Sequence, residues 1–439
     1  MGTKRAKRAR CGVALLAGAV LAAACASTAA SPPRAAVPTV TPKVAPHVEP
    51  CGPGTPTASD EIGVTQDALT VGVVADVTGI RAQFLPSWEA MQSFAAFCNS
   101  EGGIAGRHLD VRLFDTNVFS HRIAITDSCS AVFALVGSAS AFDGDGADIE
   151  SDCGIPDVPA VVLEPAHERV PTVVAPLPSP QNMFFVGPQR HIAAEHPVAV
   201  RSAAMTYLDV GVTALRATRQ IAATREIGYR YTSVDPFPAL AQPADIDHLV
   251  TKLQKHKVRY LTVQARVADL ATIQIALAAK HAMPGIVDAG TLAYDPAYIE
   301  QAGAAAEGTY VATQTTPFSD TATSPELRRY TDWLSRTVAG ATPTTLGARA
   351  WSAGLLFAEA ARRASEHLDR STLLAQLRSV HAWDGNGIQV PADPGAGLTS
   401  SCFAYLRVTG GEFRRVYPSR GFACPRDGWL RLRRDFRHL

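Results

Sequence analysis

The stretch Leu69-Thr-Val-Gly-Val-Val-Ala75 decides the fold, because it is a continuous, mostly β-branched apolar run bounded by turn residues. Such a run is typical of a strand that is buried on both faces of a parallel sheet. The pattern continues with a helix at 88–99, a strand at 109–114, a helix at 121–131 and a strand at 132–136. This βαβαβ order predicts a parallel, doubly wound sheet with helices on both faces.

A second series of alternating strands and helices begins near residue 200. Its expected strands are 201–208, 230–234, 259–263 and 285–287, and its expected helices are 213–224, 245–256 and 267–279. Three more helices are expected at 324–339, 344–365 and 371–379, before a hairpin of strands 402–408 and 413–418 around Gly410-Gly411. Two series of this size predict two α/β lobes.

The N-terminus is expected to direct export. Residues 1–24 combine five Lys and Arg residues with a 13-residue apolar run, which is typical of a signal peptide and too short to span a membrane. Leu21-Ala-Ala-Ala-Cys25 resembles a bacterial lipobox, so lipid on Cys25 would anchor the protein to the membrane; plain secretion is the alternative. Residues 25–61 are rich in Pro and Ala and are expected to form a tether.

Export also changes the charge balance. Removal of residues 1–24 takes away five of the 41 Lys and Arg residues and no acid, which leaves 36 basic residues against 40 acidic ones. A mildly acidic body does not favour nucleic acid as a partner. The basic tail at 425–439 is expected to be solvated, with anionic lipid or a membrane partner as the alternative.

Four segments carry a resemblance to a known family. Residues 63–79 look like an opening strand with its ligand-side loop, and residues 99–107, Asn-Ser-Glu-Gly-Gly-Ile-Ala-Gly-Arg, look like the turn "NxxGGIxGR". Residues 305–311 look like a strand that returns to the first lobe, and residues 383–424 look like the end of exported members with a C-terminal cysteine pair. In this order the segments resemble the type I periplasmic binding proteins, in the branch of the branched-chain amino acid receptors of ABC importers.

This resemblance implies an α/β fold of two doubly wound lobes joined by three crossings, near 186–192, 312–317 and 380–400. The first lobe would comprise residues 62–188 and 314–382, and the second lobe residues 189–313 and 383–424. A small solute would lie between the lobes, beyond the carboxyl ends of the strands, and the lobes would close on it. The protein would be a monomer that delivers solute to an ABC transporter permease, without a cofactor.

The expected ligand-binding residues follow strand ends in both lobes. They are Thr78, Gly79, Ser138, Ser140 and His167 from the first lobe and Arg266 and Asp288 from the second. The resemblance assigns hydroxyls and main-chain amides of the first lobe to a ligand carboxylate, and an acid of the second lobe to an ammonium group. These assignments predict a small polar or amino-acid-like solute. Ser138 and Ser140 could instead cap a helix, and Arg266 could be a surface charge.

The six cysteines that remain after Cys11 and Cys25 are expected to form disulfides in an oxidising compartment. The expected ends of the first-lobe helices and strands favour Cys129 with Cys153 and Cys51 with Cys98, and the hairpin favours Cys402 with Cys424. Six cysteines allow 15 connectivities, so these pairs are one choice among several.

Motifs for catalysis and for metal binding are missing from the sequence. There is no HExxH, GxSxG or GxxxxGK[ST], so an enzyme is not expected. The acids between Asp143 and Asp148 have the spacing of a calcium loop but lack its fifth and sixth positions, which favours a solvated loop without metal. A ligand sensor that signals to a membrane partner is the alternative function, and a secreted enzyme is a remote one.

Overall fold

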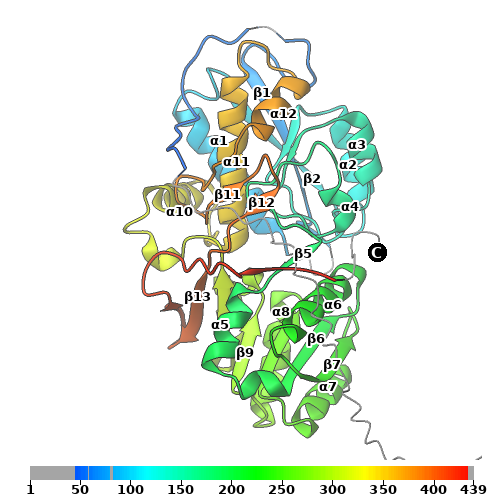
Figure 1. The fold of residues 1–439 in the computed structure, drawn as a ribbon. Helices are drawn as coiled ribbons and strands as arrows, with labels where there is room; N and C mark the ends of the chain where they lie inside the picture. Colours follow the sequence, from blue (N-terminus) through cyan, green and yellow to red (C-terminus); the bar gives the residue numbers. More distant parts are fainter. Residues whose placement is uncertain (1–44, 58, 80–82, 434–439) are drawn as a thin grey trace, which may run out of the picture. The chain divides into compact units, whose positions relative to one another are not determined.

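Two large sheets, one parallel and one mixed, organise the residues that the computed structural model describes, which are 45–57, 59–79 and 83–433 (Figure 1). The expected signal peptide, Cys25 and most of the tether lie outside them. The sheet of the first lobe has the order β2-β1-β3-β4, and all its pairs are parallel. Its strands are β1 Ala68–Ala75, β2 His108–Asp115, β3 Ala134–Val136 and β4 Asp157–Val158. β1 is central and almost wholly buried, as its apolar run predicts.

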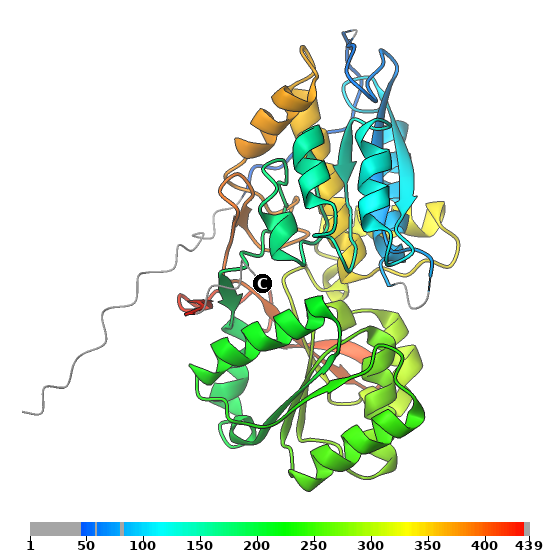
Figure 2. The same cartoon turned by 90° about the vertical axis from the view of Figure 1, so that its right-hand side faces the viewer.

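Helices from two distant parts of the chain cover the first sheet. Figures 1 and 2 both show the late helices, drawn in yellow and orange, beside the early blue and cyan elements. Helix α11 packs closely on α1 at Gly354, where a Cβ atom would lie 2.7 Å from the ring of Phe94. The early helices are α1 Leu85–Ser100, α2 His121–Cys129, α3 Ala147–Cys153 and α4 Pro165–Glu168. The late ones are α10 Pro325–Thr337, α11 Thr345–Arg363 and α12 Arg370–Arg378.

The sheet of the second lobe has seven strands in the order β14-β13-β10-β9-β8-β6-β7. Its first five strands in the chain are parallel, and the hairpin β13-β14 adds to β10 in the antiparallel sense. The strands are β6 Ala203–Leu208, β7 Tyr231–Phe237, β8 Tyr260–Gln264, β9 Ile286–Ala289, β10 Tyr310–Thr313, β13 Ala404–Thr409 and β14 Glu412–Tyr417.

The helices of the second lobe alternate with its parallel strands. They are α5 Gly187–Glu195, α6 Gly211–Arg225, α7 Pro243–Lys255, α8 Val267–Ala279 and α9 Pro296–Ala302. Short 3₁₀ helices occur at η1 Ala199–Ser202, η2 Thr291–Ala293, η3 Gly303–Ala306 and η4 Phe318–Asp320. The chain passes between the lobes three times, before α5, after β10 and before β13. This arrangement confirms the α/β fold class.

The C-terminal segment differs from the expected solvated tail. Residues Trp429–Arg431 form strand β15, which pairs in the antiparallel sense with β5, Met183–Phe185. Trp429, Leu430 and Leu432 interrupt the basic run, and these apolar side chains are buried against the body of the protein. A second short pair joins β11, Ala392–Asp393, to β12, Leu398–Thr399.

The third crossing lies late in its expected range. Trp383 and Ile388 belong to the same hydrophobic cluster as the helices of the first lobe, and the chain joins the second sheet only at β13. Asn386 fixes this segment to the first lobe by donating to the Val48 carbonyl and to Glu326.

In the described part of the chain, no helix is both long and apolar enough to cross a membrane.

Three disulfides join the six cysteines of the folded body. They are Cys51–Cys98, Cys129–Cys153 and Cys402–Cys424, the same three pairs that were expected from the sequence. The first two tie helices α1 and α2 of the first lobe to neighbouring segments, and the third closes the hairpin region of the second lobe. Each therefore restrains a part of the chain whose ends meet only after folding.

Candidate functional site

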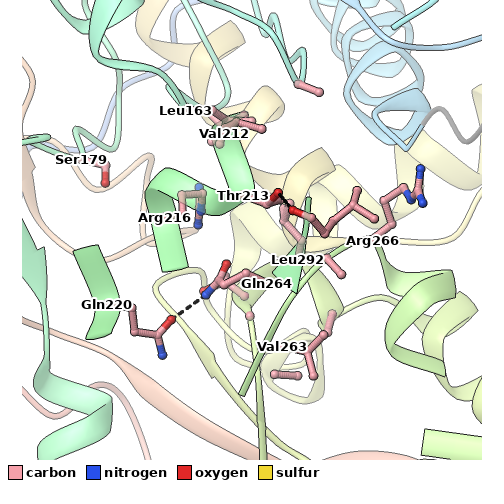
Figure 3. Close-up of a pocket in the computed structure, with 18 of the residues that line it drawn as sticks. Leu163, Ser179, Val212, Thr213, Arg216, Gln220, Val263, Gln264, Arg266 and Leu292 are labelled. Carbon is pink, nitrogen blue, oxygen red and sulfur yellow. Dashed lines mark hydrogen bonds between the residues drawn. The ribbon is translucent and has the colours of Figure 1, made fainter. Parts of the chain in front are cut away.

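A cavity of about 480 Å³ lies between the two lobes, at the carboxyl ends of the parallel strands of both sheets. The first lobe contributes the end of β1, the loops after β3 and β4, and helix α11. The second lobe contributes α6 and the segments after β8 and β9. Figure 3 labels several of their residues, among them Arg216, Gln264 and Leu292. Ligands of parallel α/β sheets bind at this edge, and the volume is typical of a small-molecule site.

Most of the cavity wall is apolar. Aromatic and aliphatic side chains come from both lobes, so a ligand would lose apolar surface to water on every side. These residues include Phe84, Phe119, Phe142, Leu163, Leu177, Val212, Leu240, Leu270, Leu292 and Trp429.

Four arginines also line the cavity, and two of them form no hydrogen bond or ion pair with a described residue. Arg216 from α6 and Arg349 from α11 form no hydrogen bond and no ion pair with any described residue, and Nε of Arg349 is buried. Arg219 is held differently, because it donates to the side chain of Gln181 and, over 2.8 Å, to the carbonyl of Met183. Cationic groups from opposite lobes therefore face one cavity.

Burial and mutual repulsion both act on these arginines. Burial, with the charge of Arg216 as a second cause, lowers the pKa of Arg349 to about 10. The pKa of Arg219 falls to about 10 for the same two reasons. These values stay far above neutral pH, so the side chains remain charged. An unpaired charge in an apolar wall is costly, and an anionic ligand would relieve that cost.

The two acids of the cavity are already satisfied by the protein. Asp76, at the end of β1, accepts from the hydroxyls of Thr116 and Ser140 and from the amide of Ala141. Burial raises the pKa of Asp76, and these donors oppose that rise.

Asp288, at the end of β9, accepts from the hydroxyl of Tyr260 over 2.6 Å and from that of Tyr405 over 2.7 Å. Burial raises the pKa of Asp288 to about 6, although these donors oppose the rise. Neither Asp288 nor Asp76 therefore neutralises the arginines.

The segment after β8 supplies further polar groups. Arg266 donates to Asp269 over 2.6 and 3.0 Å and to the Ala239 carbonyl over 2.9 Å, so its charge is paired. Gln264 donates to Gln220 over 2.6 Å, a bond drawn in Figure 3. These contacts fix the side chains at the cavity wall before any ligand arrives.

The expected site residues fall into three groups. Arg266 and Asp288 line the large cavity. Ser138, Ser140 and His167 instead line a second cavity of about 10 Å³ inside the first lobe.

Thr78 and Gly79 are exposed and line neither cavity, and Thr78 donates its amide and its hydroxyl to Asp115. The sequence reasoning missed Arg216, Arg219 and Arg349. Polar side chains at 216, 219 and 220 interrupt the apolar face of α6. This interruption was the signal in the sequence that could have indicated a polar site there.

His167 is the centre of a buried acidic cluster. Its Nδ1 lies 3.0 Å from Asp143 Oδ2, and its Nε2 lies 2.9 Å from Asp157 Oδ2 and 3.7 Å from Glu150 Oε2. All four residues are at most 3% exposed. The expected solvated loop at 143–148 is therefore wrong at its first residue, because Asp143 turns inward and accepts the amides of Leu163 and Glu164.

Burial shifts the titration of this acidic cluster. It raises the pKa of Glu150 to about 8. The charge of His167 opposes this rise, and the charges of Asp157 and Asp143 add to it. Burial also raises the pKa of Asp157. It would lower the pKa of His167, but the carboxylates of Glu150 and Asp143 outweigh it and raise that pKa well above its usual value.

Two α/β lobes around a cavity of ligand size define a solute-binding protein of the periplasmic type. Residues 68–412 match the periplasmic binding protein family, and the chain belongs to this family. Its fold is the type I fold of the branched-chain amino acid ABC transporter substrate-binding proteins, as expected from the sequence. Members of this family are exported solute-binding proteins rather than enzymes.

Solved structures share this fold at low sequence identity. A fatty acid ABC transporter substrate-binding protein from Thermomonospora curvata is 18% identical, with 82% of this chain and 94% of that chain covered and a TM-score of 0.70. The leucine binding protein LivK from Thermotoga maritima is 19% identical, with 82% and 100% covered and a TM-score of 0.67.

The branched-chain amino acid binding protein LivJ from Streptococcus pneumoniae, solved with isoleucine, is 16% identical, with 82% and 100% covered and a TM-score of 0.67. No curated protein matches the chain in sequence.

Proposed function

We propose that this protein is an exported lipoprotein, anchored through Cys25, that captures a small solute between its lobes and delivers it to an ABC transporter permease. The family and the cavity between the lobes support solute capture. The signal-like N-terminus and the small residues before Cys25 support export and lipid attachment.

The solute we propose is an anion with a sizeable apolar body, such as a fatty or aromatic carboxylate. One observation carries this proposal: Arg216 and Arg349 reach the cavity from opposite lobes, and neither forms a hydrogen bond or an ion pair among the residues described. A carboxylate between them would pair with both lobes at once and would stabilise the closed form. The apolar wall would hold the rest of the molecule.

This proposal replaces the expectation of an amino-acid-like solute. An amino acid carries an ammonium group, which needs an acceptor that the protein has not already used. The oxygens of Asp288 accept from Tyr260 and Tyr405, so this acid is occupied. A fatty acid ABC transporter substrate-binding protein shares the fold of this chain, so the fold can accommodate a carboxylate on an apolar body.

The expected site residues have distinct proposed roles. Arg266 and Asp288 shape the wall of the cavity, and Ser140 positions Asp76 beside it. Ser138 accepts the amide of Val74 and so fixes the loop after β3. These residues would act mainly by holding the site in a form that is ready to bind.

Calorimetry with octanoate and with leucine tests the ligand class. We expect octanoate to bind more tightly than leucine, and Arg349→Gln and Arg216→Gln each to weaken octanoate binding by about 2 to 5 kcal/mol, as for buried charge pairs elsewhere. Arg225→Gln is the matched control, because Arg225 is exposed at the end of the same helix α6.

Leucine binding that both cavity variants leave unchanged would contradict the proposed ligand class. Absence of binding across carboxylates, amino acids and amides would contradict solute capture itself. For the anchor, Cys25→Ala should release the protein from membranes, and an unlipidated native protein would refute lipid attachment. Solute-dependent uptake by cells, lost on deletion of a neighbouring permease, separates transport from sensing.

A further inference from the structure

The acidic cluster of the first lobe has a shortage of positive charge. Three carboxylates, Asp143, Glu150 and Asp157, surround the single imidazole of His167. All of them are closed off from solvent. A group of buried charges is stable only when it is neutralised and its remaining polar atoms are bonded. The charges of His121 and Arg216 also act on Asp143, but burial lowers the pKa of His121, and neither residue forms an ion pair with the cluster in the described part of the protein. One imidazolium cannot neutralise three carboxylates.

Glu150 makes the shortage specific. It is fully buried, and neither of its carboxyl oxygens has a hydrogen-bond partner in the described part of the protein. Oδ1 of Asp157 is also buried without a partner. Protonation of Glu150 would remove its charge, but one proton can join at most two of these three unpartnered oxygens. A proton therefore does not complete this cluster.

We propose that Glu150, Asp157 and His167 bind one divalent transition metal ion of the Zn²⁺ or Mn²⁺ class. Each residue offers one donor atom, and these three atoms lie within 4.8 Å of one another, a grouping that recurs nowhere else in the described residues. Two carboxylate oxygens and one imidazole nitrogen form a donor set of the kind that binds Zn²⁺ in proteins. Ca²⁺ is disfavoured, because it takes six to eight oxygen ligands.

The surroundings of His167 fit a metal ligand. With Nδ1 bonded to Asp143 at 3.0 Å, Nε2 is directed at Asp157 and Glu150. A carboxylate behind the imidazole orients the ring and makes it a better ligand. The adjoining cavity of about 10 Å³ is close to the volume of one water, which can supply a fourth ligand.

Three short elements bring the donors together. Glu150 lies on α3, Asp157 begins β4 and His167 lies on α4. The disulfide Cys129–Cys153 holds the end of α3 against α2. Because these elements meet only in the folded lobe, metal binding would contribute directly to its stability.

Refolding of the mature protein tests this site, since a closed site exchanges metal slowly. The protein is unfolded in urea with EDTA, refolded with Zn²⁺, Mn²⁺, Ca²⁺ or Mg²⁺, and desalted. We expect about one Zn²⁺ or Mn²⁺ per chain by mass spectrometry of the metal, with a raised melting temperature, and no retained Ca²⁺ or Mg²⁺. Glu150→Gln should weaken retention at least tenfold. Glu164→Gln, in the same lobe but outside the donor set, should retain metal as the wild type does.

Failure of the refolded wild type to retain either transition metal would overturn the proposal, whatever the variants do. Equal retention by wild type and Glu150→Gln would also overturn it, because the metal would then sit on surface histidines. If Glu150→Gln does not fold, Asp157→Asn provides the same comparison. X-ray absorption of the bound metal should show nitrogen and oxygen neighbours without sulfur, and a sulfur neighbour would contradict the assignment.

Discussion

Two groups of charged side chains in this protein differ in sign and in surroundings. In the first lobe, three carboxylates enclose His167 in a site that is closed to solvent. Between the lobes, Arg216 and Arg349 face a cavity of about 480 Å³ without an acidic partner among the described residues. A closed site suits a small, permanently bound partner, whereas a cavity of this volume suits a solute that enters and leaves.

Charged side chains that are paired within the protein differ from those that are not. Arg266 lies at the same cavity as Arg216, but its bidentate contact with Asp269 completes its charge within the protein. Leaving a buried charge unpaired costs several kcal/mol, so such a charge indicates a partner outside the chain. The sign of the unpaired charge then gives the sign of the partner. The acidic cluster indicates a cation, and the arginines indicate an anion.

The largest expected effect concerns the centre of the acidic cluster. His167→Leu should lower the free energy of unfolding by about 3 to 5 kcal/mol, because it removes the group that pairs with Asp143 and Asp157. Urea unfolding followed by circular dichroism measures this loss. His381→Leu is the control, since His381 pairs with Asp393 at the surface and should change stability by about 0.5 kcal/mol or less. A loss below about 1 kcal/mol for His167→Leu would mean that the cluster contributes little.

The next effect concerns the disulfide beside this cluster. The double variant Cys129→Ser/Cys153→Ser should lose about 3 kcal/mol, and Cys402→Ser/Cys424→Ser should lose a similar amount, because the loops that they close have separations of 24 and 22 residues. Amide hydrogen exchange distinguishes the two. Only the first variant should accelerate exchange in α3, which carries Glu150. Unchanged exchange there would show that α3 does not depend on this bond.

The sequence predicted most of the fold but only part of the site. Helix α8 was expected at 267–279 and occupies those residues, because its apolar pattern and its flanking turns are local signals. Strand ends likewise led to Arg266 and Asp288, which line the cavity, while their contact with a ligand stays a prediction. Arg216 and Arg349 lie within helices, where a charged residue usually marks a solvated face, and only the packing of the lobes directs them to the cavity.

The pairing of β15 with β5 was missed for a related reason. Trp429–Arg431 lies in a basic run, and its partner strand is more than 200 residues away in the sequence. No local signal reports such a contact. Asp143 was misread in the same way, because acids in a glycine-rich loop are usually exposed, and here the later amides of Leu163 and Glu164 bury it.

A smaller effect concerns the acid of the cavity. Burial raises the pKa of Asp288 from 3.8 to about 6, so between these values the folded protein binds more protons at this site than the unfolded chain does. The contribution of Asp288 to stability therefore falls as the pH rises through that window. Relative to Asp288→Asn, the wild type should lose about 2 kcal/mol between pH 4 and pH 7. Unfolding at a series of pH values measures this difference, and Asp127→Asn on exposed α2 is the control. A constant difference across the range would contradict the shift.

The smallest effect lies between the two charged groups. Ser140 lines the small cavity beside His167, and its hydroxyl donates over 2.7 Å to Asp76, which lines the large one. Ser140→Ala should cost about 1 kcal/mol of stability, because Asp76 keeps its bonds to Thr116 and Ala141. Once a solute is known, its dissociation constant should change by about threefold or less, because the hydroxyl is already used within the protein. A loss of about tenfold or more in affinity, with stability intact, would show that Ser140 contacts the solute directly, as the strand-end pattern predicts.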